Sequence, residues 1–494
     1  MPANPITVQL VVLLFDAVGY ESFFRSVLQR GLQAKMGVVA APAIALLDAG
    51  LHFATFNPLW VATTFVADLV WGLTYYYGKG LPATDQSFRM GHRDFCDKAR
   101  NVARPKPIIS MAGGKAAVAG RVGIIGVGYE GFRPAILDLS TRELMYQAAS
   151  KAYADAGVEP RTDVGSFICC TEDLWEGWSI ADEMVPDQIG GARRPVCTVP
   201  GDGIIGMGHA VMHIRSGIAD VVVVEAHSKV ADVLDKAAVE NLALDPAFHR
   251  VTGANSDVLA GLEMSAFMEK ARVGREDLSR IVKAEKGKAL RNPRASYGAT
   301  LDLEEIDSAE PIAEPLRRFD RPDYAEAGVV LVLASEKWIR RNKKDAVFVE
   351  GVAWRSTTPW FEGGGVETAK YAKDCFEAVM KQAGLKGLGS FDILEVDDTY
   401  SYKLLQHLMS MGASKSSAIR MVEDGGGELN PSGGSLGVGY LIEATGSEKV
   451  LECVLQIRGE AGGNQGDAPK SAFALSWRGN PTATGAAIAL SAEN

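Results

Sequence analysis

Apolar runs that alternate with amphipathic stretches dominate the chain after about residue 117. The runs RVGIIGVG, SFICC, ADVVVVEA and AVFVEGVA are apolar almost throughout, which is typical of strands buried on both faces of a sheet. The stretches STRELMYQAASKAYADAGV and ETAKYAKDCFEAVMKQAGL repeat apolar residues at three- and four-residue spacing and end near a glycine, which predicts amphipathic helices with a C-terminal cap. Such alternation of strands and helices predicts a layered α/β fold.

The same order of elements occurs twice. The strand RVGIIGVG has a counterpart in AVFVEGVA, so Gly126 corresponds to Gly351, and Ile168 of SFICC corresponds to Ile393 at the same offset. In each half a glycine-rich loop, a helix and a further strand follow. We therefore predict two duplicated α/β halves, residues 117–344 and 345–494, that meet at the charged surface stretch RRNKKD.

The first 116 residues differ in their hydrophobic pattern, with apolar stretches at 8–18, 37–51 and 58–77. No cationic segment precedes the first stretch, so a secretory signal is not expected. The third stretch is long enough to span a bilayer, but Asp68 in its middle would be costly there. We expect a mainly helical extension without an assigned role. Membrane association and a natural start at Met111 stay open as alternatives.

Composition and charge narrow the class of protein. The 494 residues are 47% hydrophobic and 23% charged, as in an ordinary globular protein. The net charge of −10 argues against nucleic acid as a partner, because phosphates require basic surfaces. Six cysteines fit neither a disulfide scaffold nor a CxxC zinc site, so we expect reduced thiols and a cytoplasmic location.

Two glycine motifs raise the alternative of a dehydrogenase. GxGxxG matches occur at residues 126–131 and 201–206, and Glu225 follows the second about 20 residues later, as in a dinucleotide-binding unit. However, Pro200 directly precedes the second match, and after the first no helix is expected before Ser140. Dinucleotide binding is therefore the weaker interpretation.

A histidine pair raises the alternative of a metal site. His209 and His213 in HAVMH have the i,i+4 spacing that can place two ligands on one helix face. The motif lacks the glutamate of HExxH and an evident third ligand. We interpret the pair as helix-packing residues and expect no bound metal.

The glycine-rich segments carry a resemblance to a known family. GELNPSGGSLGVGYLIEATG resembles the thiolase loop whose usual form is NPSGGxxxxGHPxGATG. LQIRGEAGGNQ resembles the QLRGEAG segment of sterol-carrier-protein-type thiolases, and IRSGIADVVVVEAHSK resembles the strand after their nucleophile helix. From about Gly123 to Leu490 the chain is thus similar to the thiolase superfamily. The resemblance implies an α-β-α-β-α core and coenzyme A thioesters as substrates, with no bound cofactor.

The nucleophile loop departs from the family pattern. A thiolase places a nucleophilic cysteine at a helix N-terminus, with a base and oxyanion donors nearby. The family's spacing puts Pro200 or Gly201 at that position, and Cys197 lies three residues upstream. Asp202 stands at the predicted helix start, where it either caps the helix or serves as acid, base or water-positioning group.

The other three catalytic loops also differ. The loop that usually reads NEAF or HDCF here reads Asp397-Asp398-Thr399-Tyr400, and Tyr440 replaces the GHP histidine. Ser476 replaces the cysteine of CxG, two residues before Arg478, which could pair with a carboxylate or a coenzyme A phosphate. The resemblance implies catalytic residues at Tyr440, Asp397, Asp398, Tyr400 and Asp202, and substrate-binding residues at Gly201, Gly203, Ser476, Arg478, Gly433 and Gly434.

Together the four replacements argue against an acyl-cysteine mechanism. Steroid side-chain aldolases are thiolase-like relatives with a tyrosine in the corresponding loop, and GGSLGVGYL is similar to their pattern. We therefore predict C–C bond cleavage or formation on coenzyme A thioesters, by acyl transfer or retro-aldol chemistry. The alternative is a catalytically inactive acyl-CoA-binding scaffold subunit. The resemblance also implies a homodimer and suggests a small zinc-ribbon/OB-fold partner.

Overall fold

The computed structural model describes residues 120–492 except 174, 176–179, 359–364, 424–428 and 479–482. The chain divides into two units, Met1–Lys115 and Ala116–Asn494. The three apolar stretches near the N-terminus therefore lie outside the described residues. Within the described ranges, no helix has the length and apolar character needed to cross a bilayer.

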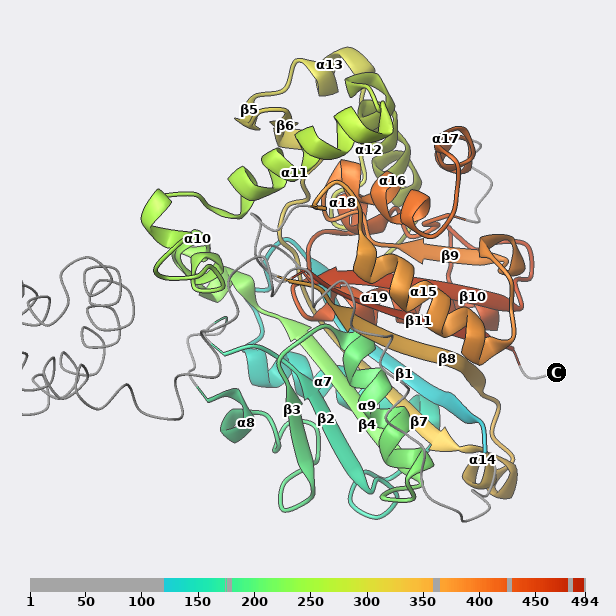
Figure 1. Ribbon diagram of the computed structural model, residues 1–494. Coiled ribbons are helices and arrows are strands. Elements are labelled where there is room, and N and C mark those ends of the chain that lie inside the picture. The colour runs from blue at the N-terminus through green and yellow to red at the C-terminus, as the bar shows by residue number, and fades with distance from the viewer. Residues whose placement is uncertain are drawn as a thin grey trace, which may run out of the picture. The chain divides into compact units, whose positions relative to one another are not determined.

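A nine-stranded mixed sheet forms the framework, with strand order β3-β2-β4-β7-β1-β8-β11-β10-β9 (Figure 1). The first half contributes β1 (Val122–Arg133), β2 (Ser166–Cys170), β3 (Val196–Val199), β4 (Val221–Ser228) and β7 (Glu326–Ser335). The second half contributes β8 (Val347–Ser356), β9 (Ile393–Val396), β10 (Ser471–Arg478) and β11 (Thr484–Ser491). A parallel bridge between Leu394 and Leu429 takes the place that β3 has in the first half, so the strand order repeats as the sequence predicts.

The halves join where β1 pairs with β8 over only Val122–Ile124. The central helices α9 (Gly203–Arg215) and α19 (Ala444–Arg458), one from each half, contact each other and share one core with the sheet. The helix α7 (Thr141–Ala156) covers the outer face of the first half, and α15 (Lys370–Ala383) and α16 (Ser401–Ser410) cover that of the second. This is the predicted α-β-α-β-α layering.

Local sequence accounts for the predicted helix α7. Ser140 and Glu143 form a capping box at its start, and Gly157 ends it with a φ of 63°. The first GxGxxG motif lies within β1 beneath this helix. A Cβ at Gly128 would overlap the α7 backbone, so this glycine permits close helix–sheet packing.

The second GxGxxG motif serves the contact between the central helices. A Cβ at Gly203 would overlap Ser447 of α19, and one at Gly206 would overlap Cys170 of β2. The glycines therefore let α9 approach its neighbours in both halves. Packing accounts for both motifs that raised the dehydrogenase alternative.

A helical excursion between β4 and β7 covers one end of the sheet. It comprises α10 (Lys236–Asn241), α11 (Ser256–Ala271), α12 (Arg275–Ala289), α13 (Leu303–Asp307) and the hairpin β5 (Pro311–Ala313)–β6 (Leu316–Arg317). It packs on α16, α17 (Lys415–Glu423) and α18 (Gly434–Val438) of the second half. The remaining helices are the short α8 (Ala181–Met184) and α14 (Glu336–Asn342), with single 3-10 turns elsewhere in the described chain.

Candidate functional site

A cavity of about 350 Å³ lies beneath the helical excursion, where chain segments leave the carboxyl ends of β2, β9 and β10. Crevices at strand carboxyl ends are the usual ligand sites of α/β proteins. Five aromatic side chains line the cavity, from Trp175, Tyr324, Tyr400, Tyr440 and Trp477. Four carboxylates (Glu172, Asp173, Glu240 and Asp257) and two guanidinium groups (Arg321 and Arg478) make up its charged lining.

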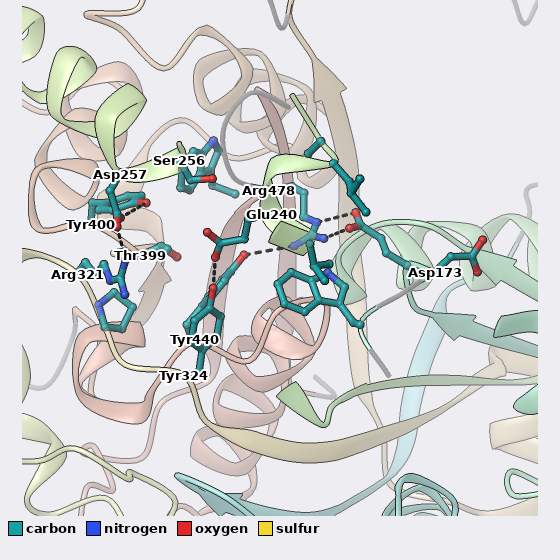
Figure 2. Close-up of a pocket in the computed structure, with 17 residues that line it drawn as sticks. Asp173, Glu240, Ser256, Asp257, Arg321, Tyr324, Thr399, Tyr400, Tyr440 and Arg478 are labelled. Carbon is teal, nitrogen blue, oxygen red and sulfur yellow. Dashed lines mark hydrogen bonds and ion pairs between the residues drawn. The ribbon is translucent and has the colours of Figure 1, made fainter. Parts of the chain in front are cut away.

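Figure 2 shows how the charged and phenolic groups are distributed. Asp257, Tyr400 and Arg321 gather on one side, and Arg478 lies on the other. Between them Glu240, Tyr324 and Tyr440 point toward one another. The two halves of the chain and the helical excursion therefore all contribute to the site.

A short strained loop presents Tyr440. Its backbone N–H donates to the Asp323 carbonyl at 2.8 Å, and its carbonyl accepts from Ala325 at 3.0 Å. Two residues later Ile442 has a φ of 52°, which is unfavourable for a β-branched residue and stands where the loop turns into α19. The loop geometry thus holds the ring against Tyr324, with centroids 5.7 Å apart.

The Tyr440 hydroxyl accepts a hydrogen bond from Arg478 Nη1 at 3.2 Å. Burial raises the pKa of Tyr440 above its ordinary value despite the neighbouring Arg478 charge, so the phenol keeps its proton at neutral pH. Because its oxygen accepts from the guanidinium, the hydroxyl proton is available to a ligand in the cavity. Tyr440 is therefore placed to donate to an oxyanion.

Carboxylates hold Arg478 in place. Its Nε donates to Glu172 at 2.9 Å, and its Nη2 donates to Glu443 at 3.1 Å. Of the two partners predicted for this arginine, carboxylate or phosphate, the structure provides the carboxylate. The fixed guanidinium can polarise the Tyr440 hydroxyl without reorganising.

Glu240 of α10 is a site residue that the sequence analysis missed. Tyr324 Oη donates to Glu240 Oε1. Burial raises the pKa of Glu240 to about 7 with help from Asp257, while Arg321 and Arg478 act in the opposite direction. No motif marks this glutamate, because it stands in a short polar helix of ordinary composition.

Tyr400 lies at the predicted site, but its hydroxyl is engaged. It donates to Asp257 Oδ1 at 3.3 Å, and Asp257 also pairs with Arg321. Burial, Asp257 and Glu240 raise the pKa of Tyr400 well above its usual range. The uncharged Tyr400 side chain therefore lines the cavity beside the Asp257–Arg321 ion pair.

Asp202 lies outside the cavity lining and links the two central helices. Its Oδ1 accepts from Ile204 N at 2.9 Å, which caps α9, and from Ser476 Oγ at 2.5 Å. Its Oδ2 accepts from Gly446 N at 2.8 Å at the start of α19. Burial raises its pKa to about 6, and these hydrogen bonds limit the rise. Of the two roles predicted for Asp202, the geometry matches the cap.

Asp397 and Asp398 are fully buried and also lie outside the cavity lining. Asp397 accepts from Thr399 N at 3.0 Å, and Asp398 accepts from Ser435 N at 2.5 Å and from Leu436 N at 3.2 Å. Asp398 therefore caps α18 and holds the glycine-rich loop. The catalytic role predicted for Asp397 and Asp398 stays a prediction, and the structure shows neither of them in the cavity lining.

Most of the predicted substrate-binding residues share this supporting position. Arg478 lines the cavity, whereas Gly201, Gly203, Gly433, Gly434 and Ser476 do not. They surround the helix starts that Asp202 and Asp398 cap. Cys197, on β3, is likewise outside the lining.

Metal-ligating side chains approach one another at a separate place. Cys169, Glu225 and His227 bring one ligand atom each within 4.8 Å of the others. The Glu225 carboxylate already accepts from Cys169 Sγ at 2.8 Å and lies 2.9 Å from His227 Nδ1. The cluster is fully buried, faces α7 and is not part of the cavity lining.

The HAVMH histidines have packing roles. His213 Nδ1 lies 3.0 Å from Ser166 Oγ, and His209 stacks on Trp354 with centroids 5.4 Å apart. Burial and His213 lower the pKa of His209. The pair thus ties α9 to β2 and β8.

The chain was compared with known protein families, with characterised relatives and with solved structures. Residues 2–84 match the family described as type II CAAX prenyl endopeptidase Rce1-like. An acetyl-CoA acetyltransferase of Methanothermobacter thermautotrophicus is 26% identical over 70% of the chain and 92% of its own length. A 17-hydroxy-3-oxo-4-pregnene-20-carboxyl-CoA lyase of Mycobacterium tuberculosis is 24% identical over 69% of the chain and 92% of its own length.

Among solved structures, one described as an Ltp2-ChsH2(DUF35) aldolase has a TM-score of 0.65 at 23% identity. It covers 76% of this chain and 98% of its own. The duplicated halves, the paired central helices and these matches all concern the part of the chain beyond the N-terminal extension. Through that part, the chain has the thiolase fold and resembles members of the thiolase superfamily in sequence.

Proposed function

We propose that this protein is a carbon–carbon lyase that cleaves, and in reverse forms, 3-hydroxyacyl-CoA thioesters by a retro-aldol mechanism without a cysteine nucleophile. The observation that carries the proposal is the protonated Tyr440 phenol, backed by Arg478, at a cavity whose described lining contains no cysteine. The lyase and aldolase named among the relatives support this choice over acyl transfer.

Retro-aldol cleavage produces an enolate, whose oxygen must be stabilised in the transition state. Donors fixed in advance at such an oxygen typically contribute about 10²–10³-fold in rate each. The Tyr440 hydroxyl supplies one donor, and the Arg478 guanidinium strengthens it. An acyl-enzyme is not needed in this chemistry, because the bond breaks within one substrate.

The charge of the cavity orients the substrate. The cavity lining contains four carboxylates and two arginines, and both arginines, Arg478 and Arg321, are paired with carboxylates. Coenzyme A phosphates would be repelled from such a lining. The acyl group therefore enters the cavity, with its thioester oxygen near Tyr440, and the nucleotide stays outside.

The test uses the purified full-length protein with 3-hydroxyacyl-CoA and 3-oxoacyl-CoA substrates and follows release of the shorter acyl-CoA by chromatography. We expect cleavage of the 3-hydroxyacyl-CoA and a loss of about 100-fold in kcat for Tyr440→Phe. The matched control is Tyr146→Phe, an exposed tyrosine on α7, which should retain full activity. Cleavage of neither substrate, with coenzyme A thioesters still bound, would instead favour the inactive scaffold.

We also propose that the protein works as a homodimer and with a small partner subunit. The support is the resemblance to the thiolase superfamily and the similar solved structure described as an Ltp2-ChsH2(DUF35) aldolase. Light scattering of the purified protein tests the first part, and copurification with the product of an adjacent small reading frame tests the second.

A further inference from the structure

Four carboxylates line the cavity, and three of them are already occupied. Glu172 is paired with Arg478, and Asp257 is paired with Arg321. Asp173 accepts from the backbone N–H of Ala181 at 3.0 Å. A carboxylate held by a cation or a backbone donor is a weak base, because the bond stabilises its charged form.

Glu240 differs from these three. Within the described part of the chain it makes no ion pair, and the hydrogen bond that reaches it comes from the neutral Tyr324 hydroxyl. Tyr324 is itself fixed, because its carbonyl accepts from Tyr297 Oη and its ring packs on Tyr440. The carboxylate is therefore held in one orientation while keeping the capacity to take a proton.

The position of Glu240 suits a reaction that begins at Tyr440. Figure 2 shows its carboxylate next to the Tyr440 and Tyr324 side chains, and all three residues line the cavity. A 3-hydroxyacyl-CoA with its thioester oxygen at Tyr440 has its hydroxyl two carbons away. Among the four cavity carboxylates, Glu240 is the one that neither pairs with an arginine nor accepts from a backbone N–H within the described residues, so it is the one with the capacity to take the proton of that hydroxyl.

We propose that Glu240 is the catalytic base of the cleavage and Tyr324 the residue that positions it. This inference rests on the proposed lyase function and assigns it a proton path. Glu240 takes the proton of the 3-hydroxyl group, the carbonyl of the departing ketone or aldehyde forms, and the bond between the α and β carbons breaks. The electron pair passes to the enolate of the shorter acyl-CoA, and Glu240 returns the same proton to its α-carbon. No other reactant is consumed.

The groups that face Glu240 determine its ionisation. They are Asp257 of α11, Arg321 before β7, Arg478 of β10, and the phenols of Tyr324, Tyr400 and Tyr440. Burial and Asp257 favour the protonated form, and the two arginines oppose them. With a pKa of about 7, Glu240 can accept and return a proton near neutral pH, which is the condition for efficient acid–base catalysis.

The experiment measures kcat/KM for 3-hydroxyacyl-CoA cleavage against pH in full-length wild type, Glu240→Gln and Tyr324→Phe. In wild type we expect activity to fall below about pH 7 as Glu240 becomes protonated. Glu240→Gln should lower kcat/KM by about 10²–10⁴-fold, and the decrease of activity on the acidic side of the pH profile (the acidic limb) should disappear. Tyr324→Phe keeps the ring but removes the donor to the carboxylate, so the limb should move to higher pH.

Controls separate the possible failures. Glu269→Gln, an exposed glutamate on α11, should match wild type, and circular dichroism should show all variants folded. An active wild type with an unchanged acidic limb in Glu240→Gln overturns the assignment of Glu240 but leaves the lyase function standing. A wild type that cleaves no 3-hydroxyacyl-CoA overturns both.

Discussion

Replacing Asp202 by alanine tests whether this carboxylate holds the two central helices together or takes part in chemistry. The side chain accepts hydrogen bonds from Ile204 N at 2.9 Å, from Gly446 N at 2.8 Å and from Ser476 Oγ at 2.5 Å. Only 2% of it is exposed, so water cannot readily replace these bonds. Asp202→Ala therefore removes one helix cap and leaves two further buried donors without an acceptor.

The size of the effect follows from these three bonds. Loss of an N-cap costs about 1 kcal/mol, and each buried donor left unsatisfied costs about 1–3 kcal/mol. The substitution also removes a buried carboxylate whose pKa is raised to about 6, which offsets part of the loss. We therefore expect the free energy of unfolding to fall by about 3 kcal/mol, near the lower end of the summed range.

The assay is equilibrium unfolding in urea followed by tryptophan fluorescence, together with kcat at a temperature where the variant is folded. Asp163→Ala serves as control, since the exposed Asp163 accepts one backbone hydrogen bond at 2.8 Å and should change stability by less than about 1 kcal/mol. We expect Asp202→Ala to keep kcat within a few fold of wild type. Unchanged stability with a large loss of kcat would refute the structural role and restore Asp202 as a catalytic residue.

Two further predictions concern the loop that carries Tyr440. Gly434 has a φ of 59°, and a Cβ there would overlap the Asp398 carboxylate. Gly217 has a similar φ of 78°, but the space around it is open. Gly434→Ala should therefore lower the melting temperature more than Gly217→Ala does. Equal shifts would contradict this reasoning. Burial raises the pKa of Asp398 to about 7, above its ordinary 3.8, so the native state binds a proton that the unfolded chain releases. The free energy of unfolding should therefore fall as pH rises from about 4 to 7. The measurement is the urea midpoint at about pH 5 and about pH 8, and the decrease between the two should be smaller in Asp398→Asn than in wild type. An equal decrease in both proteins would contradict the prediction.

The glycine-rich loop that carries Tyr440 could be located from sequence because its signals are local. Glycines at Gly433 and Gly434 and the tyrosine at Tyr440 stand in one continuous segment that resembles the thiolase loop. Tyr440, Tyr400 and Arg478 line the cavity, and their roles in catalysis and substrate binding stay predictions. Asp397 and Asp398 show the limit of this approach, since a carboxylate after a strand can face a ligand or cap a neighbouring helix, and here Asp398 caps α18.

The sequence by itself determined the duplicated order of elements, the buried strands and the capped helices, because periodicity and capping depend on residues a few positions apart. Only the tertiary structure decided which distant groups meet. Asp202 bonds Ser476 from the other half of the chain, and Glu240 meets Tyr324 across the helical excursion. The electrostatics of Glu240 depend on burial and on Asp257, Arg321 and Arg478, which come from three separate segments. A pKa reflects the surroundings that folding creates, and no local pattern in the sequence encodes them.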